Sequence, residues 1–238
     1  MKCLILLMVP LLSQNIYSQE VQVLAKADVA LRSVKNESEF CFIHQATDLG
    51  KLQFVATIEA NYSDRYIGLE DLYLAIANKA KKLGANSFAP HSYKRSDSTN
   101  RISLVLDVYF SSDEMLLLNK SVKDTNTLYV FAGEKNDQSA YQRVLINNRE
   151  LDLEGGTYFQ YMLDKGETVT VKKPGFESSA KKIVGTADHD PTFLMLWGGF
   201  AVSDYKPTKI NTTLSGGYIN VLDENFGELM KEIFLPID

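Results

Sequence analysis

The densest group of metal-ligand side chains in the sequence is Asp188-His189-Asp190, directly before Pro191. Carboxylates bind hard cations, and an imidazole between them suits a transition metal, so these three residues are a candidate metal site. A stable metal site needs three or four ligands, and aspartates before a proline are also common in turns. We therefore expect a turn here, with a metal site as the alternative.

Two other residue pairs have spacings that occur in enzymes. Cys41 and His44 suggest thiol–imidazole chemistry, and Ser178 and Lys181 have the spacing of a serine–lysine acyl-transfer motif. On a strand, however, residues three positions apart point to opposite faces. The serine–lysine spacing follows a Pro-Gly turn, without the further motifs of such enzymes. The sequence thus predicts no catalytic residue, no cofactor and no enzyme activity, and an unrecognised hydrolase is the last alternative.

Aromatic residues are frequent, with 12 Tyr and 12 Phe in the chain. A set in the second half suits a stacking face for a carbohydrate or a peptide, namely Tyr158, Phe159, Tyr161, Phe193, Trp197 and Phe200. Because neighbours on a strand point to opposite faces, at least half of the set is expected in a core. The candidates for an exposed binding surface are Tyr158, Tyr161 and Trp197.

The first 18 residues have the layout of an export signal. Lys2 supplies a positive start, residues 4–12 are an apolar run, and Ser18 is a small residue at the expected cleavage point. The run is shorter than the roughly 20 apolar residues that span a bilayer. We expect cleavage before Gln19, export to the periplasm or exterior of a bacterial cell, and no transmembrane segment in the mature chain.

The composition is that of a globular protein, with 45% hydrophobic and 23% charged residues among 238. The net charge is −5, and it becomes −6 when Lys2 leaves with the signal. No block of Lys and Arg is present, so nucleic-acid binding is not predicted. Cys41 is then the single cysteine, so core packing rather than an intrachain disulfide must supply the stability.

The pattern of residues 19–112 predicts a helix packed on an antiparallel sheet. The helix is expected over about 69–83, because apolar residues recur there at a spacing of three to four, and Gly84 would end it. Alternating apolar residues and turn signals predict strands at 21–31, 40–44, 51–60, 86–93 and 101–110. Pro90 indicates an edge strand or a bulge.

The polar stretch 113–126 is interpreted as a linker, and residues 127–238 as a second domain. Strands are expected at 127–133, 141–146, 156–162, 167–173, 192–202 and 217–222. Asn147-Asn148 and Lys165-Gly166 are expected turns, and 223–234 a closing helix. Short strands at this spacing predict an antiparallel β-sandwich. The expected fold class is therefore α+β, a small helix-on-antiparallel-sheet domain followed by an antiparallel β-sandwich.

Two stretches resemble known bacterial families. The pattern that leads from the helix into the next strand consists of Ala77, Ala80, Lys81, Leu83, Gly84, Ala85 and Asn86. It resembles the helix-to-strand joint of small β-α-β domains described as heavy-metal binders, and of envelope stress-sensor lipoproteins. No cluster of Cys or His accompanies the pattern, so metal binding is not carried over to this chain.

The second resemblance covers three strand-like runs, Val144-Leu145-Ile146-Asn147-Asn148, Leu153-x-x-Gly156-Thr157-Tyr158 and Val169-x-Val171-x-x-Pro174-Gly175-Phe176-Glu177-Ser178. They resemble the PEGA-type β-sandwich of bacterial cell surfaces and a related family of exported domains of unknown function. The resemblance implies a surface module for binding or spacing, and it has no counterpart after residue 185.

The expected function is therefore a non-enzymatic envelope or surface module that binds another envelope component, either a protein or a glycan. The alternative is a periplasmic ligand- or metal-binding protein centred on Asp188, His189 and Asp190. Both expectations rest on the export signal and on likeness of fold, and a fold by itself does not imply a function.

Overall fold

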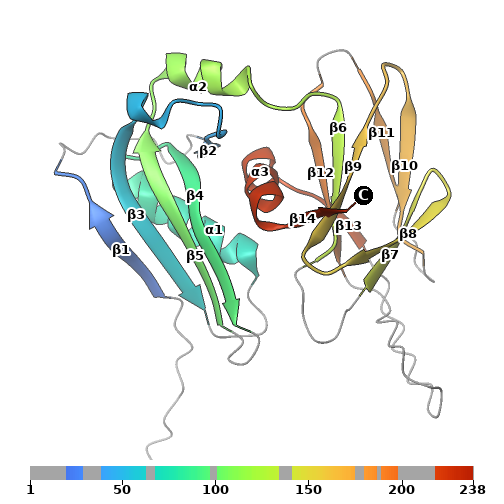
Figure 1. The fold of residues 1–238 in the computed structure, drawn as a ribbon, viewed down its shortest axis with the longest axis horizontal. Helices are drawn as coiled ribbons and strands as arrows, with labels where there is room; N and C mark the ends of the chain where they lie inside the picture. The colour runs from blue at the N-terminus through green and yellow to red at the C-terminus, as the bar shows by residue number, and fades with distance from the viewer. Residues whose placement is uncertain are drawn as a thin grey trace, which may run out of the picture.

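A computed structural model describes residues 20–28, 39–62, 68–96, 101–133, 141–174, 180–186, 189–197 and 218–237. These residues form a β-rich α+β fold with three sheets and three α-helices (Figure 1). The expected export signal lies outside the described residues. None of the described helices is long and apolar enough to cross a membrane.

The first sheet contains five strands in the order β1-β3-β5-β4-β2. Their bounds are β1 Glu20–Lys26, β2 Cys41–Phe42, β3 Gln53–Tyr62, β4 Ser87–Ser96 and β5 Arg101–Phe110. All pairings are antiparallel except that of β2 with β4. The register of β4 against β5 shifts between Pro90 and Ser92, which confirms the bulge predicted from the proline.

Helix α1 covers one face of this sheet and spans Leu69–Lys82. Glu70 and Asp71 lie in its first turn and three lysines in its last, which suits the helix dipole at both ends. Gly84 has a φ of 86°, the left-handed conformation that ends helices without strain in glycine. The helix predicted from the spacing is confirmed, because periodicity and terminal signals agree over this segment.

The remaining strands form a second and a third sheet. The second has the order β13-β12-β6-β9-β14, with bounds β6 Thr127–Phe131, β9 Thr157–Met162, β12 Thr192–Trp197, β13 Tyr218–Val221 and β14 Leu235–Ile237. The third has the order β11-β10-β7-β8, with bounds β7 Tyr141–Ile146, β8 Arg149–Glu154, β10 Thr168–Lys172 and β11 Ala180–Val184. The turn between β7 and β8 has positive φ at Asn147 and Asn148, as predicted.

The prediction of wholly antiparallel strands in this half is wrong. Strand β12 pairs with β6 in parallel, and β14 pairs with β9 in parallel. Parallel neighbours need a long connection, and here β6 and β12 are far apart in the chain while α3, Glu224–Ile233, precedes β14. One hydrophobic cluster draws side chains from both sheets, among them Leu128, Leu194 and Leu196 of the second and Val144 and Val171 of the third.

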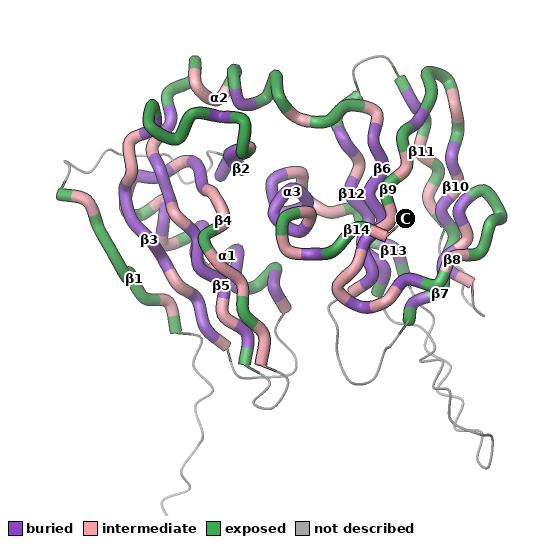
Figure 2. The backbone as a smooth tube through the Cα atoms, in the orientation of Figure 1, coloured by how far each residue is buried: buried purple, intermediate pink, exposed green. Residues whose placement is uncertain are grey.

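Helix α3 lies between the first sheet and the second sheet (Figure 1). A single cluster of buried side chains continues from the first sheet and α1 through α3 to the second sheet. Within it the ring of Tyr73 on α1 lies 5.3 Å from that of Phe226 on α3, and Phe131 of β6 lies 5.7 Å from Phe234. In Figure 2 much of α3 is coloured as buried residues. The closing helix predicted at 223–234 is thus confirmed as α3, and it packs in the interior.

The segment interpreted as a linker, 113–126, contains helix α2, Asp113–Lys120. The Ser112 hydroxyl accepts a hydrogen bond from the Met115 amide, and Asp113 and Glu114 lie in the first turn. Its apolar residues Leu117 and Leu118 are exposed, while Asn119 is buried. This reversal of the usual pattern points to a specific role for the Asn119 amide.

Candidate functional site

The exposed aromatic pair Trp197 and Tyr218 lies at the end of two neighbouring strands of the second sheet. The two residues face each other in the register of β12 and β13. Their ring centroids are 6.5 Å apart with an angle of only 8° between the planes, and the residues are 37% and 52% exposed. The two rings are thus stacked with nearly parallel planes, and we call this partly exposed pair the aromatic platform.

Lys173 anchors the strand end that carries this platform. Its ammonium donates hydrogen bonds to the Trp197 carbonyl oxygen at 2.8 Å and to Oε1 of Gln142 at 3.4 Å. The residue is almost fully buried, and burial lowers the pKa of its ammonium to about 8. Because a buried ammonium needs acceptors, these contacts hold Trp197 in place from the interior side.

The other two candidates for a binding surface have different surroundings. Tyr158 is buried at 8% exposure and packs against Tyr129 and Phe131, so its placement on an exposed face is wrong. Tyr161 is half-buried, and its hydroxyl donates a hydrogen bond to Glu167 at 2.6 Å. Of the three predicted residues, Trp197 is therefore the one that is exposed and stacks on a neighbouring ring.

The predicted metal triple is only partly visible. Asp188 lies outside the described residues, and the side chain of His189 is exposed, with its Nδ1 against the Asp190 carbonyl oxygen. Asp190 contacts the ammonium of Lys123 at 2.6 Å, and this hydrogen bond lowers the pKa of its carboxyl. The described residues contain no group of three or more metal-ligand side chains. Metal binding at this triple stays a prediction, and a lysine already occupies one of its carboxylates.

Cys41 and His44 both line a small cleft where β2, α2 and α3 meet. The cleft has a volume of about 20 Å³, which is room for about one water molecule. Burial raises the pKa of the Cys41 thiol to about 11, and burial together with Lys231 lowers the pKa of His44 to about 4. A thiol of high pKa is a poor nucleophile at neutral pH, so the geometry favours a structural role for both side chains.

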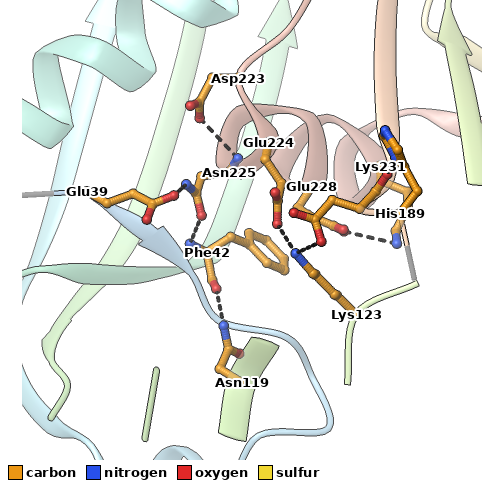
Figure 3. A network of polar contacts seen from close by, with 11 residues as sticks. Glu39, Phe42, Asn119, Lys123, His189, Asp223, Glu224, Asn225, Glu228 and Lys231 are labelled. Atoms are coloured by element: carbon orange, nitrogen blue, oxygen red, sulfur yellow. Dashed lines mark hydrogen bonds and ion pairs between the residues drawn. The ribbon is translucent and has the colours of Figure 1, made fainter. Parts of the chain in front are cut away.

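Two asparagines fill the outer side of β2 at this cleft (Figure 3). Asn225 on α3 accepts a hydrogen bond from the Phe42 amide at 2.8 Å. Asn119 on α2 donates to the Phe42 carbonyl oxygen at 2.7 Å and accepts from the His44 amide at 2.9 Å. These side-chain amides take the place that a neighbouring strand would have, and they join α2 and α3 to the first sheet.

Two buried lysines form ion pairs beside the asparagines (Figure 3). Lys123, with a side chain 10% exposed, lies 2.6 Å from Asp190 and 2.9 Å from Glu224. Burial opposes its charge, but the hydrogen bonds with Asp190 and Glu224 raise the pKa of its ammonium above the usual value. Lys123 thus ties the chain before β6 to α3 and to the segment before β12.

Lys231 on α3 is the centre of the second ion-pair group. It lies 2.8 Å from Asp124 and 2.9 Å from Glu228, and 5.0 Å from the centroid of the Tyr129 ring. Glu228 is 2% exposed, and burial raises the pKa of its carboxyl despite the nearby ammonium. These charges compensate one another inside the joint between the sheets.

Cys41, His44, His91 and His189 do not share one pocket. Cys41 and His44 line the cleft, whereas His189 lines a separate groove beside β11. Nδ1 of His91 lies 2.9 Å from Asp107 on the exposed side of the first sheet. Ser178 of the serine–lysine spacing lies outside the described residues, and Lys181 is on β11.

Several residues of these sites escape prediction from the sequence. Tyr218 lies in the strand predicted at 217–222, but its neighbour Trp197 is 21 positions away, so the pairing of the two rings could not be predicted. Asn119 and Asn225 look like ordinary polar helix residues. The sequence offers one signal at Asn119, which directly follows three leucines, 116–118.

Comparison of the chain with protein-family models, with curated proteins and with solved structures returns no match. The function must therefore be argued from the geometry of the described residues.

Proposed function

We propose that this protein is an exported, non-enzymatic module of the bacterial envelope that binds another envelope component through the aromatic platform. The two sheets that share the second core are interpreted as a β-sandwich of the PEGA-like kind, which displays this platform at one end. The observation that carries the proposal is the exposed, stacked pair of Trp197 and Tyr218.

The chemistry of the platform favours a glycan over a protein as the bound component. The faces of indole and phenol rings are apolar and electron-rich, and they attract the C–H-lined face of a sugar ring. The stacked rings of Trp197 and Tyr218 leave ring surface exposed at the end of β12 and β13. A sugar unit can stack on this exposed ring surface.

The surroundings of the titratable residues support a binding role over a catalytic one. The thiol of Cys41 is buried with a raised pKa, and its neighbour His44 has a lowered pKa. Lys123 and Lys231 are engaged in ion pairs between elements. Each of these groups has a structural contact that accounts for its burial.

Tryptophan fluorescence provides a direct test, because Trp197 is the single tryptophan of the chain. The probe is the mixture of soluble saccharide fragments that a muramidase releases from bacterial peptidoglycan. We expect these fragments to shift or quench the emission of Trp197 in a saturable way. The variant Tyr218→Ala should weaken the binding about threefold to tenfold, since stacking on one ring contributes about 0.5–1.5 kcal/mol.

Two matched variants complete this experiment. Tyr218→Phe keeps the ring and should bind as the wild type does, and Tyr161→Phe changes a tyrosine that lies away from the platform. Emission that stays constant at saturating fragment concentration would rule out peptidoglycan as the component. Equal affinity of the wild type and Tyr218→Ala would rule out the platform as the site.

Export is tested separately from binding. The mature protein isolated from its native cell should begin at Gln19 and be recovered from periplasmic or extracellular fractions. Recovery from the cytosol with Met1 at the N-terminus would refute the export part of the proposal.

A further inference from the structure

A groove of about 410 Å³ opens along one edge of the two sheets that share the second core. It lies between β11, an edge strand of the third sheet, and β13, an edge strand of the second sheet. Its lining combines basic with apolar side chains and includes Lys181, Lys182, Ile183, His189, Leu194 and Val221. Val221 is 62% exposed although Leu194 beside it belongs to the core, so apolar surface continues from the core to the outside here.

The opposite edge of the third sheet has the opposite charge. It is formed by β8, which pairs only with β7 among the described strands. Strand β8 carries Glu150, Asp152 and Glu154, and the exposed Arg143 on β7 contacts the first two at 2.9 Å and 2.8 Å. Among the described residues of β7 and β8, the three carboxylates outnumber the two arginines, Arg143 and Arg149.

Apolar surface is exposed beside this acidic edge as well. Strand β8 contacts β9 of the second sheet, and β14 pairs with β9. Leu235 on β14 is 69% exposed. Each of the two edges therefore combines an edge strand of the third sheet with an exposed apolar residue of the second sheet.

We infer that the groove-side edge binds the β8 edge of a second copy of this chain, so that the third sheet continues from one molecule into the next. Strands β8 and β11 are similar in length, with six and five residues. Main-chain hydrogen bonds between them supply the attachment, because each edge presents a row of unpaired N–H and C=O groups. Charge complementarity selects which edge meets which.

The pleat of the third sheet places the complementary charges on one face. Lys182 lies opposite Thr170 in the register of β10 and β11, and Val171, its neighbour on β10, points into the core. Lys182 is therefore on the outer face of the sheet. On β8, Leu153 points into the core, so Glu150 and Asp152 are also on the outer face. When β8 of the second copy lies beside β11, these carboxylates lie on the same side as Lys182.

The contact joins two different surfaces, so it is heterologous. Such contacts form rings when the rotation closes and open chains when it does not. Because the two surfaces lie on opposite edges of one sheet, the expected product is an open chain of molecules whose length grows with protein concentration.

Sedimentation velocity of the purified mature protein tests this inference. We expect the weight-average mass to rise with concentration. It should fall when salt is raised to about 1 M, where the screening length is about 3 Å. The variants Lys182→Glu and Glu150→Lys/Asp152→Lys should each associate about tenfold more weakly, since like charges then meet at the contact.

Mixing the two variants distinguishes the paired edges from nonspecific charge effects. An equimolar mixture should recover the association, because every contact again joins a basic edge to an acidic edge. A control, Lys26→Glu, makes the same charge change at an exposed lysine of β1. It should associate as the wild type does, and Glu150→Lys/Asp152→Lys should only end its chains, because that variant keeps a basic groove-side edge but carries a basic β8 edge.

Three results would overturn the inference: a wild type that stays monomeric at all concentrations, variants that associate as the wild type does, or a mixture that fails to recover. The measurement uses the protein without any saccharide, so its outcome is independent of binding at the aromatic platform.

Discussion

At the scale of single residues, burial changes the chemistry of side chains that look reactive in the sequence. His44 is half-buried, its ring lies 5.2 Å from that of Phe42, and the charge of Lys231 is near. Both the loss of solvation and the positive neighbour disfavour the imidazolium form. The neutral imidazole therefore belongs to the packing of the joint between α2, α3 and the first sheet.

This environment predicts how stability depends on pH. The pKa of His44 is about 4 in the folded state against 6.5 for a solvated histidine, so the unfolded state binds the proton more readily. The contribution of His44 to stability is complete above about pH 6.5 and is lost as the pH falls toward 4. We expect urea unfolding to show that wild type loses about 1–3 kcal/mol more than His44→Gln between pH 7 and pH 4.5.

The wild type must be compared with His44→Gln, because the contribution of Glu228 to stability changes with pH in the opposite direction. Burial raises the pKa of its carboxyl, so its contribution is present at low pH and is lost as the pH rises through the folded-state pKa. Glu228 is common to both proteins, and its effect cancels in their difference. A difference that does not change with pH would show that His44 is not shielded as described.

At the scale of secondary-structure elements, β2 depends on side chains from two helices. This strand has two residues and pairs with β4 on one side only. Asn119 satisfies the Phe42 carbonyl oxygen, the His44 amide and the Thr47 hydroxyl, while Asn225 satisfies the Phe42 amide. Without them, buried backbone groups would have no acceptor or donor.

Asn119→Ala is therefore expected to destabilise the protein by about 2–4 kcal/mol, since a buried group left without its hydrogen bond costs about 1–3 kcal/mol. The measurement is the free energy of unfolding in urea. Leu117→Ala on the same helix changes a side chain that is 69% exposed, and it should have little effect. Equal losses in the two variants would mean that α2 contributes by helix propensity and not through the Asn119 amide.

The packing of helix α3 on β12 depends on the absence of a side chain at Gly227. A Cβ at Gly227 would lie 2.2 Å from Cγ and 2.7 Å from Cβ of Phe193. The absence of a side chain thus lets α3 approach β12 closely. In an exposed helix, exchanging glycine for alanine stabilises by about 1 kcal/mol.

The variant Gly227→Ala should therefore do the opposite of what helix propensity predicts. We expect a loss of about 1–3 kcal/mol or more, because the overpacked ring of Phe193 must move. Thermal unfolding followed by circular dichroism measures this loss, with Glu232→Ala on the same helix as the control. A higher melting temperature for Gly227→Ala would contradict the close packing of α3 on β12.

At the scale of the whole molecule, one hydrophobic cluster joins elements from both ends of the chain. It contains Phe88 of the first sheet, Phe226 of α3 and Phe193 of the second sheet. Beside this cluster, the ion pairs of Lys123 and Lys231 join α3 to the chain before β6. A shared core of this kind couples the unfolding of the sheets that it connects.

Calorimetry should accordingly show one unfolding transition, with equal calorimetric and van't Hoff enthalpies. Phe226→Ala should lower the temperature of the entire transition, since removal of a buried phenylalanine costs about 3–5 kcal/mol. Two separate transitions in the wild type would show that residues 19–112 and 127–238 fold as independent units.

Prediction from the sequence works well where a pattern is local. Helix α1 and strand β5 follow the predicted bounds closely, because the spacing of apolar residues decides which face is buried. Strands β8 and β11 escape prediction, since each is short, charged and at the edge of a sheet. Helix α2 was not predicted either, because it buries an asparagine and exposes two of its leucines, Leu117 and Leu118.

For the candidate site, the sequence identifies single residues but not their neighbours. Trp197 is named correctly as an exposed aromatic residue, whereas Tyr158 belongs to the core. The alternation of a strand shows that two residues point to opposite faces, yet it does not show which face the rest of the chain covers. Here α3 covers the face with Tyr158.

The sequence by itself thus determined the local elements, from the periods of helix and strand and from glycine and asparagine at turns. The tertiary structure alone decided the parallel pairings of β12 and β14, the interior place of α3, and the meeting of Trp197 with Tyr218. These depend on contacts between residues far apart in the chain. Such contacts form only when the free energy of burying whole surfaces exceeds the entropy of ordering the segments between them.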